Sequence, residues 1–95
     1  MNEDQKGILE DAAFKWGPRF QFDIAIEEAA EFIQAVCHCK RDKKTIEDMI
    51  SEAADVYISA YQIGLIYGHD LFNSIVDNKL ERLKRRVESG NPNET

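Results

Sequence analysis

Residues 22–39 read FDIAIEEAAEFIQAVCHC. Apolar side chains recur in this segment every three or four positions, at Phe22, Ala25, Ala29, Phe32 and Val36. Because an α-helix has 3.6 residues per turn, this spacing places them on one face. The segment is therefore predicted to be a helix that buries this stripe.

The same helical spacing continues on both sides of this segment, interrupted by few glycines and prolines. Thr45 is expected to cap the helix that follows, whose apolar stripe includes Ile46, Ile50 and Tyr57. Gly68 is expected to separate that helix from the last one, and residues 91–95 to form a frayed tail. The sequence thus predicts an all-α fold of four helices, over about residues 2–15, 22–39, 46–67 and 71–89.

Length and charge restrict the class of protein. With 95 residues and a mass of 10.9 kDa, residues 1–95 are expected to form one small domain with a thin core, completed by oligomerisation. A formal net charge of -6 argues against binding to DNA or RNA polymers. The chain has no apolar run of about 20 residues, as a membrane span requires, and its first residues are acidic. A cytoplasmic protein is expected.

Two carboxylate pairs mark successive helices. Glu28 and Glu31 are three residues apart, and so are Glu52 and Asp55. Residues with this spacing lie on the same side of a helix, with Cβ atoms roughly 5–6 Å apart. Two antiparallel helices with such pairs can bring four carboxylates together.

A cluster of four carboxylates favours a divalent cation, because the cation relieves their mutual repulsion. Oxygen ligands without His or Cys suit Mg²⁺, or Mn²⁺, rather than Zn²⁺. The Glu-x-x-His pairs of di-iron bundles are missing, since Ala35 stands three residues before His38 and Ile66 three before His69. The alternative interpretation is a solvated acidic face without a metal.

The sequence contains the motif Glu-Glu-x-x-Glu at 27–31, followed by Glu-x-x-Asp at 52–55 and Lys-x-x-Arg at 79–82. This combination resembles the MazG family of all-α nucleoside triphosphate pyrophosphohydrolases. The resemblance covers roughly residues 22–86. It implies a four-helix unit, a homodimer or homotetramer, that releases pyrophosphate from a nucleotide substrate. It also implies Mg²⁺ binding through Glu28, Glu31, Glu52 and Asp55.

Other residues have two interpretations each. Lys79 and Arg82 could bind phosphates, or could complement the dipole at the end of their helix. Glu27 is the candidate general base, or a partner that orients the attacking water. Trp16 and Phe20 could stack on a base or could pack against protein.

A second class of function stays open beside the enzyme. The same bundle could be a non-catalytic helical interaction module that binds a partner protein. Release of pyrophosphate from a nucleotide would separate the two hypotheses.

Overall fold

The computed structural model describes residues 1–93, and this part of the chain contains three α-helices and no strand. The helices are α1 (Glu3–Trp16), α2 (Pro18–Lys40) and α3 (Ile46–Ser89). The all-α prediction is confirmed. The last two predicted helices are the two parts of α3, on either side of a kink with non-helical backbone angles at Gly68, which confirms the predicted break at this residue. Of the predicted tail, residues 94–95 lie outside the described residues.

Local capping interactions explain where α1 and α3 begin. Asn2 and Gln5 form a capping box at the start of α1, with hydrogen bonds of 2.8 and 2.9 Å. Thr45 and Asp48 form another at the start of α3, which confirms the predicted cap. Gly90 has a left-handed conformation, φ 76°, and ends α3, as glycine commonly does.

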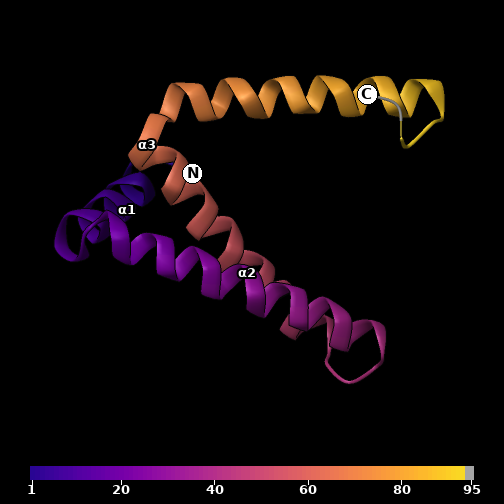
Figure 1. The fold of residues 1–95 in the computed structure, drawn as a ribbon, viewed down its shortest axis with the longest axis horizontal. Helices are drawn as coiled ribbons and strands as arrows, with labels where there is room; N and C mark the ends of the chain where they lie inside the picture. Colours follow the sequence, from indigo (N-terminus) through magenta and orange to yellow (C-terminus); the bar gives the residue numbers. More distant parts are fainter. Residues whose placement is uncertain (94–95) are drawn as a thin grey trace.

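The kink of α3 lies at Gly68, where φ and ψ are 161° and 82°. Phe72, beyond the kink, packs so closely on Gly64 that a Cβ atom on Gly64 would overlap its ring. Figure 1 shows the consequence for the overall shape, since α3 changes direction sharply here. We refer to α2 and residues 46–67 as the hairpin, and to residues 69–89 as the arm.

The hairpin and α1 form the body of the molecule. In Figure 1 α2 and the first half of α3 run side by side, and α1 lies near the end of the hairpin where the kink occurs. The Nε2 amide of the buried Gln62 donates a hydrogen bond of 2.9 Å to the carbonyl oxygen of Leu9, which ties α1 to α3. The arm runs away from the hairpin (Figure 1).

The described chain has little apolar core. Only Leu9 and Ala35 are buried apolar residues within it. The predicted stripes are only partly covered: Phe22 is 45% exposed, Ile46 60% and Tyr57 56%, whereas Ala25, Ala29 and Phe32 are half-buried. The prediction that these stripes are buried is wrong for their exposed members, because α2 turns the face of Glu28 and Ala35 toward α3.

No helix among residues 1–93 is both long enough and apolar enough to span a membrane.

Candidate functional site

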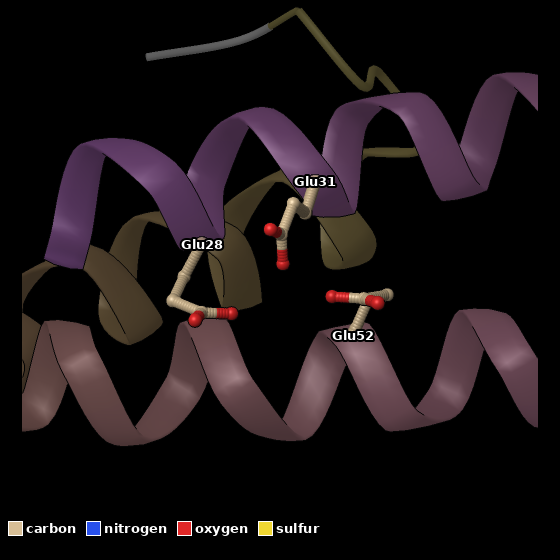
Figure 2. A group of neighbouring side chains, drawn as sticks. All are labelled: Glu28, Glu31 and Glu52. Carbon is tan, nitrogen blue, oxygen red and sulfur yellow. The ribbon is translucent and has the colours of Figure 1, made fainter.

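Three of the four predicted carboxylates meet between the hairpin helices. Glu28 and Glu31 come from α2 and Glu52 from α3, and each offers an oxygen within 4.8 Å of the other two. Figure 2 shows all three side chains pointing into the space between the helices. The spacing of three residues gives Glu28 and Glu31 a common side of α2, and the antiparallel hairpin places Glu52 opposite them.

The interior of this cluster has unsatisfied hydrogen-bonding capacity. Glu28 and Glu52 are half-buried, and the Oε2 atom of each is shielded from solvent and has no hydrogen-bond partner among residues 1–93. Most buried side-chain oxygens in folded proteins do have a partner. The two oxygens are therefore free to accept a hydrogen bond or to bind a cation.

Burial and mutual repulsion raise the pKa values of two of the carboxyl groups in the cluster. Burial raises the pKa of Glu28 above its ordinary value, and the charges of Glu31, Asp55 and Glu52 raise it further. Burial also raises the pKa of Glu31, with the charge of Glu52 as the next cause. Both shifts express the cost of holding several negative charges together in a partly desolvated space. A divalent cation would remove this cost, and the all-oxygen donor set fits a hard ion such as Mg²⁺.

Asp55 and Glu27 lie at the edge of the cluster. Both are exposed, and the oxygen atoms of Asp55 are not among those that meet within 4.8 Å. The negative charges of Asp55 and Glu27 nevertheless contribute to the raised pKa values of Glu28 and Glu31. Both residues therefore lie close to the cluster. Asp55 follows Glu52 by three residues and has a side chain one methylene shorter, which explains its outer position.

Lys79 and Arg82 lie on the arm and are exposed. Since the arm runs away from the hairpin (Figure 1), the single chain does not bring these cations to the carboxylates. Phosphate binding by Lys79 and Arg82 remains a prediction.

The aromatic pair Trp16 and Phe20 flanks the turn between α1 and α2. Their ring centroids are 6.0 Å apart, and the side chains are 57% and 45% exposed. The ammonium group of Lys15 lies 5.6 Å from the centre of the Trp16 ring. The pair therefore has free aromatic surface, and base stacking remains a prediction.

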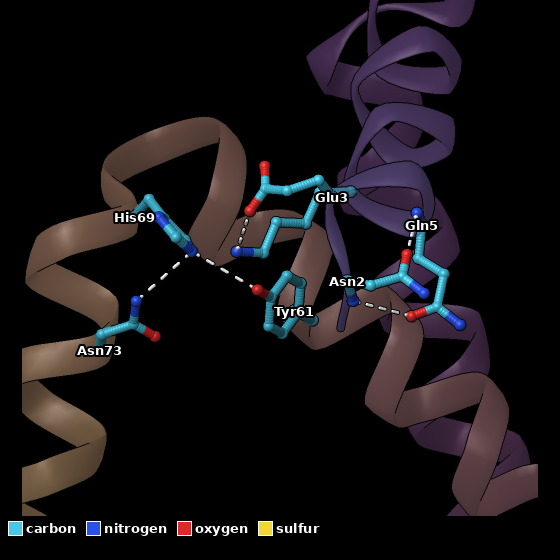
Figure 3. A network of polar contacts seen from close by, with 7 residues as sticks. Asn2, Glu3, Gln5, Tyr61, His69 and Asn73 are labelled. Atoms are coloured by element: carbon cyan, nitrogen blue, oxygen red, sulfur yellow. Dashed lines mark hydrogen bonds and ion pairs between the residues drawn. The ribbon is translucent and has the colours of Figure 1, made fainter.

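A polar and aromatic network at the kink was not foreseen from the sequence. The Tyr61 hydroxyl and the Asn73 amide both lie 3.4 Å from Nε2 of His69 (Figure 3). The Tyr61 ring also meets the Phe72 ring edge-on at 5.9 Å. His69 and Asn73 are four residues apart on the arm, as helical spacing allows, but Tyr61 lies on the other side of the kink, so helical spacing gives no signal for its contacts. The network connects the arm to the hairpin.

Comparison of the chain with protein-family models, with curated proteins and with solved structures finds no match. The resemblance to MazG enzymes therefore rests on the spacing of the carboxylates and basic residues in this sequence.

Proposed function

We propose that the protein is a Mg²⁺-dependent nucleotide pyrophosphohydrolase, which cleaves a nucleoside triphosphate to the monophosphate and pyrophosphate. The observation that carries the proposal is the meeting of Glu28, Glu31 and Glu52, two of which hold a buried oxygen that has no hydrogen-bond partner in the described part of the chain. A group of carboxylates with raised pKa values is typical of a functional site. The spacing of the motif relates this site to nucleotide hydrolysis in particular.

Each group of residues has a role in the proposed reaction. Mg²⁺, or Mn²⁺, would be held by Glu28, Glu31, Glu52 and Asp55, and would neutralise charge on the phosphates. Glu27, exposed at the edge of the cluster, orients a water molecule or takes its proton as the water attacks the α-phosphorus. The bond to the bridging oxygen breaks, and pyrophosphate leaves with that oxygen.

The remaining predicted residues act on the substrate rather than on the water. Lys79 and Arg82 hold the non-reacting phosphates through charge-assisted hydrogen bonds. Since the arm runs away from the carboxylates of its own chain, this role requires the arm of another copy in a homodimer or homotetramer. Trp16 and Phe20 offer exposed aromatic faces on which a base could stack.

Pyrophosphate release from a panel of nucleoside triphosphates, measured with Mg²⁺ and with Mn²⁺, tests the proposal. Glu28→Gln is expected to abolish turnover, and Glu27→Gln to lower kcat with little effect on metal affinity. Glu10→Gln, at an exposed position of α1, is the matched control and should leave kcat unchanged. If the wild-type protein releases no pyrophosphate from any nucleotide, the enzymatic proposal fails.

The second candidate is a non-catalytic helical interaction module. It is favoured by the amount of apolar surface on the described chain, where Ile26, Ile33 and Leu71 are all more than half exposed. Such surface is typical of helices that bind other helices. A protein that binds no nucleotide and yet associates through these helices would support this candidate.

A further inference from the structure

Two kinds of side-chain contact hold the arm to the hairpin at the kink. One is apolar, since the Phe72 ring packs on Gly64 and meets the Tyr61 ring edge-on at 5.9 Å. The other is polar, since the His69 imidazole on the arm lies 3.4 Å from the Tyr61 hydroxyl on the hairpin (Figure 3). The backbone between them has non-helical angles at Gly68, so no regular helix keeps the arm in line with the hairpin. The side-chain contacts therefore determine the direction of the arm.

The polar contact requires a neutral histidine. Nε2 of His69 lies 3.4 Å both from the Tyr61 hydroxyl and from the side-chain amide nitrogen of Asn73. An amide nitrogen only donates hydrogen bonds, so Nε2 accepts and carries no proton. The imidazole proton is then on Nδ1, and the Tyr61 hydroxyl donates to Nε2. A proton added to Nε2 would occupy the lone pair that both contacts use.

The nearest charged groups on α1 do not favour a positive charge at His69. The ammonium nitrogen of Lys6 lies 3.2 Å from Oε1 of Glu3. This hydrogen bond raises the pKa of Lys6, and Tyr61 raises it further, which places the Lys6 ammonium near the Tyr61 hydroxyl. An imidazolium at His69 would thus share the Tyr61 hydroxyl with an ammonium group whose carboxylate partner is already paired.

The other elements at the kink supply no countercharge that contacts His69. From α2, the uncharged Phe22 stacks on Tyr67, with ring centroids 5.3 Å apart. On the arm, Asp70 is exposed and, as the next residue along the helix, points to a different side from His69. His69 forms an ion pair with no Asp or Glu among residues 1–93. Protonation would therefore add a charge that no carboxylate at this position compensates.

We propose that His69 is a pH-sensitive contact at the kink, which fixes the arm to the hairpin through Tyr61 when neutral and lets the arm turn about Phe72 when protonated. Histidine is the side chain that ordinarily gains its proton between about pH 5 and 8, so the arm is fixed above this range and released as the pH falls through it. The Phe72 contact has no titratable group and persists, and the polar contact is long for a hydrogen bond. The effect is therefore on the orientation of the arm rather than on overall stability.

The orientation of the arm determines where its cations, Lys79 and Arg82, can act. The proposal rests on contacts within one chain, and it does not depend on the proposed hydrolysis or on self-association.

Pulsed electron spin resonance of the full chain measures the orientation of the arm. Spin labels are attached to the native Cys37 of α2 and to Glu88→Cys near the end of the arm, both exposed positions, in a chain that carries Cys39→Ser. An excess of unlabelled chain restricts the measurement to distances within one chain. One narrow distance peak is expected at about pH 8, and its loss to a broader distribution at about pH 5.5. The same distribution at both pH values would overturn the proposal.

Matched variants of the two histidines in the chain identify the responsible group. His69→Gln retains an acceptor but cannot gain a proton in this range, so the narrow peak should be present at both pH values. His38→Gln should leave the pH response intact. Tyr61→Phe retains the ring that meets Phe72 but lacks the hydroxyl, so the broad distribution should be present already at about pH 8. A pH response that persists in His69→Gln would assign it to other groups and overturn the proposal.

The tautomer of His69 can be tested in the wild-type chain, so this test remains decisive if a variant at the kink fails to fold. Long-range ¹H–¹⁵N spectra show which imidazole nitrogen carries the proton, and the spectrum of His38→Gln assigns the signals of His69. At about pH 8 the proton should be on Nδ1. A proton on Nε2 would overturn the proposal, because Nε2 could then accept neither from Tyr61 nor from Asn73.

Discussion

Glu28 on α2 and Glu52 on α3 lie opposite each other between the two helices, with carboxylate oxygens within 4.8 Å of each other (Figure 2). In each residue Oε2 is shielded from solvent and has no hydrogen-bond partner within residues 1–93. Two shielded anionic groups at this distance destabilise the fold that brings them together. A cation bound between them, as proposed above, would relieve this repulsion.

The first prediction concerns metal-dependent stability. Mg²⁺ should raise the thermal midpoint of unfolding, because an ion that binds only the folded chain stabilises it by about 2.7 kcal/mol at a concentration of 100 Kd. The double change Glu52→Gln and Asp55→Asn should remove this gain. Asp23→Asn, at an exposed position of α2, is the control and should retain it. Calorimetry with and without Mg²⁺ measures the thermal midpoint of each variant. If Mg²⁺ raises the midpoint of the double variant as much as that of the wild type, the ion binds elsewhere.

The second prediction concerns pH in the absence of metal. The pKa values of Glu28 and Glu31 are raised above the ordinary value of 4.5, so above pH 4.5 the folded chain holds more protons than the unfolded chain. The free energy of unfolding should therefore fall as the pH rises from 4.5 through the raised pKa values. Urea denaturation with a chelator, from pH 4.5 to 7, measures this dependence.

Glu28→Gln provides the control for the pH effect, because it removes one of the two carboxyl groups whose pKa is raised. The free energy of unfolding of this variant should fall less steeply as the pH rises. Asp48 acts in the opposite direction, since its hydrogen bonds with Thr45 lower its pKa below 3.8. The contribution of Asp48 to the free energy of unfolding is lost only as the pH falls below 3.8 and through its lowered pKa. A free energy of unfolding that rises between pH 4.5 and 7 would contradict close crowding of the carboxylates.

The third prediction separates the cations from the metal site. Lys79→Ala and Arg82→Ala should each lower kcat/KM about tenfold or more, since a lost charge-assisted contact costs roughly 1.5–3 kcal/mol. Stabilisation by Mg²⁺ should persist, because neither residue lies among the carboxylates. Lys84→Ala is the matched control on another side of the arm. If turnover continues unchanged in both variants, Lys79 and Arg82 serve only to complement the helix dipole.

The fourth prediction concerns the kink. Gly64→Ala should destabilise the fold by about 1–3 kcal/mol, because the added methyl group would overlap the Phe72 ring and one of the two must move. Gly7→Ala is an informative control, since nothing lies within 4 Å of a Cβ atom there. That change should stabilise α1 by about 0.5–1 kcal/mol, as alanine favours helix over glycine. Thermal unfolding of both variants gives the comparison, and equal midpoints would show that the Phe72 contact has no role.

Local features of the sequence were sufficient to predict the helices and the meeting of three of the four carboxylates. Thr45 caps α3 because its side-chain oxygen accepts a hydrogen bond from the backbone N–H of Asp48, and this interaction spans only four residues. The meeting of Glu28, Glu31 and Glu52 follows from helical spacing and a short connection between antiparallel helices. Both depend on neighbours in the chain, so both could be derived before the structure.

The tertiary structure decided which faces the helices bury and where the arm goes. Phe22, Ile46 and Tyr57 have the spacing of a core and are nevertheless exposed, because helical spacing shows which residues share a face but not what covers it. Lys79 and Arg82 are likewise separated from the carboxylates by a bend at Gly68, which depends on the Phe72 ring fitting against Gly64. Such fits join residues on two sides of a turn and arise only when the whole chain is packed.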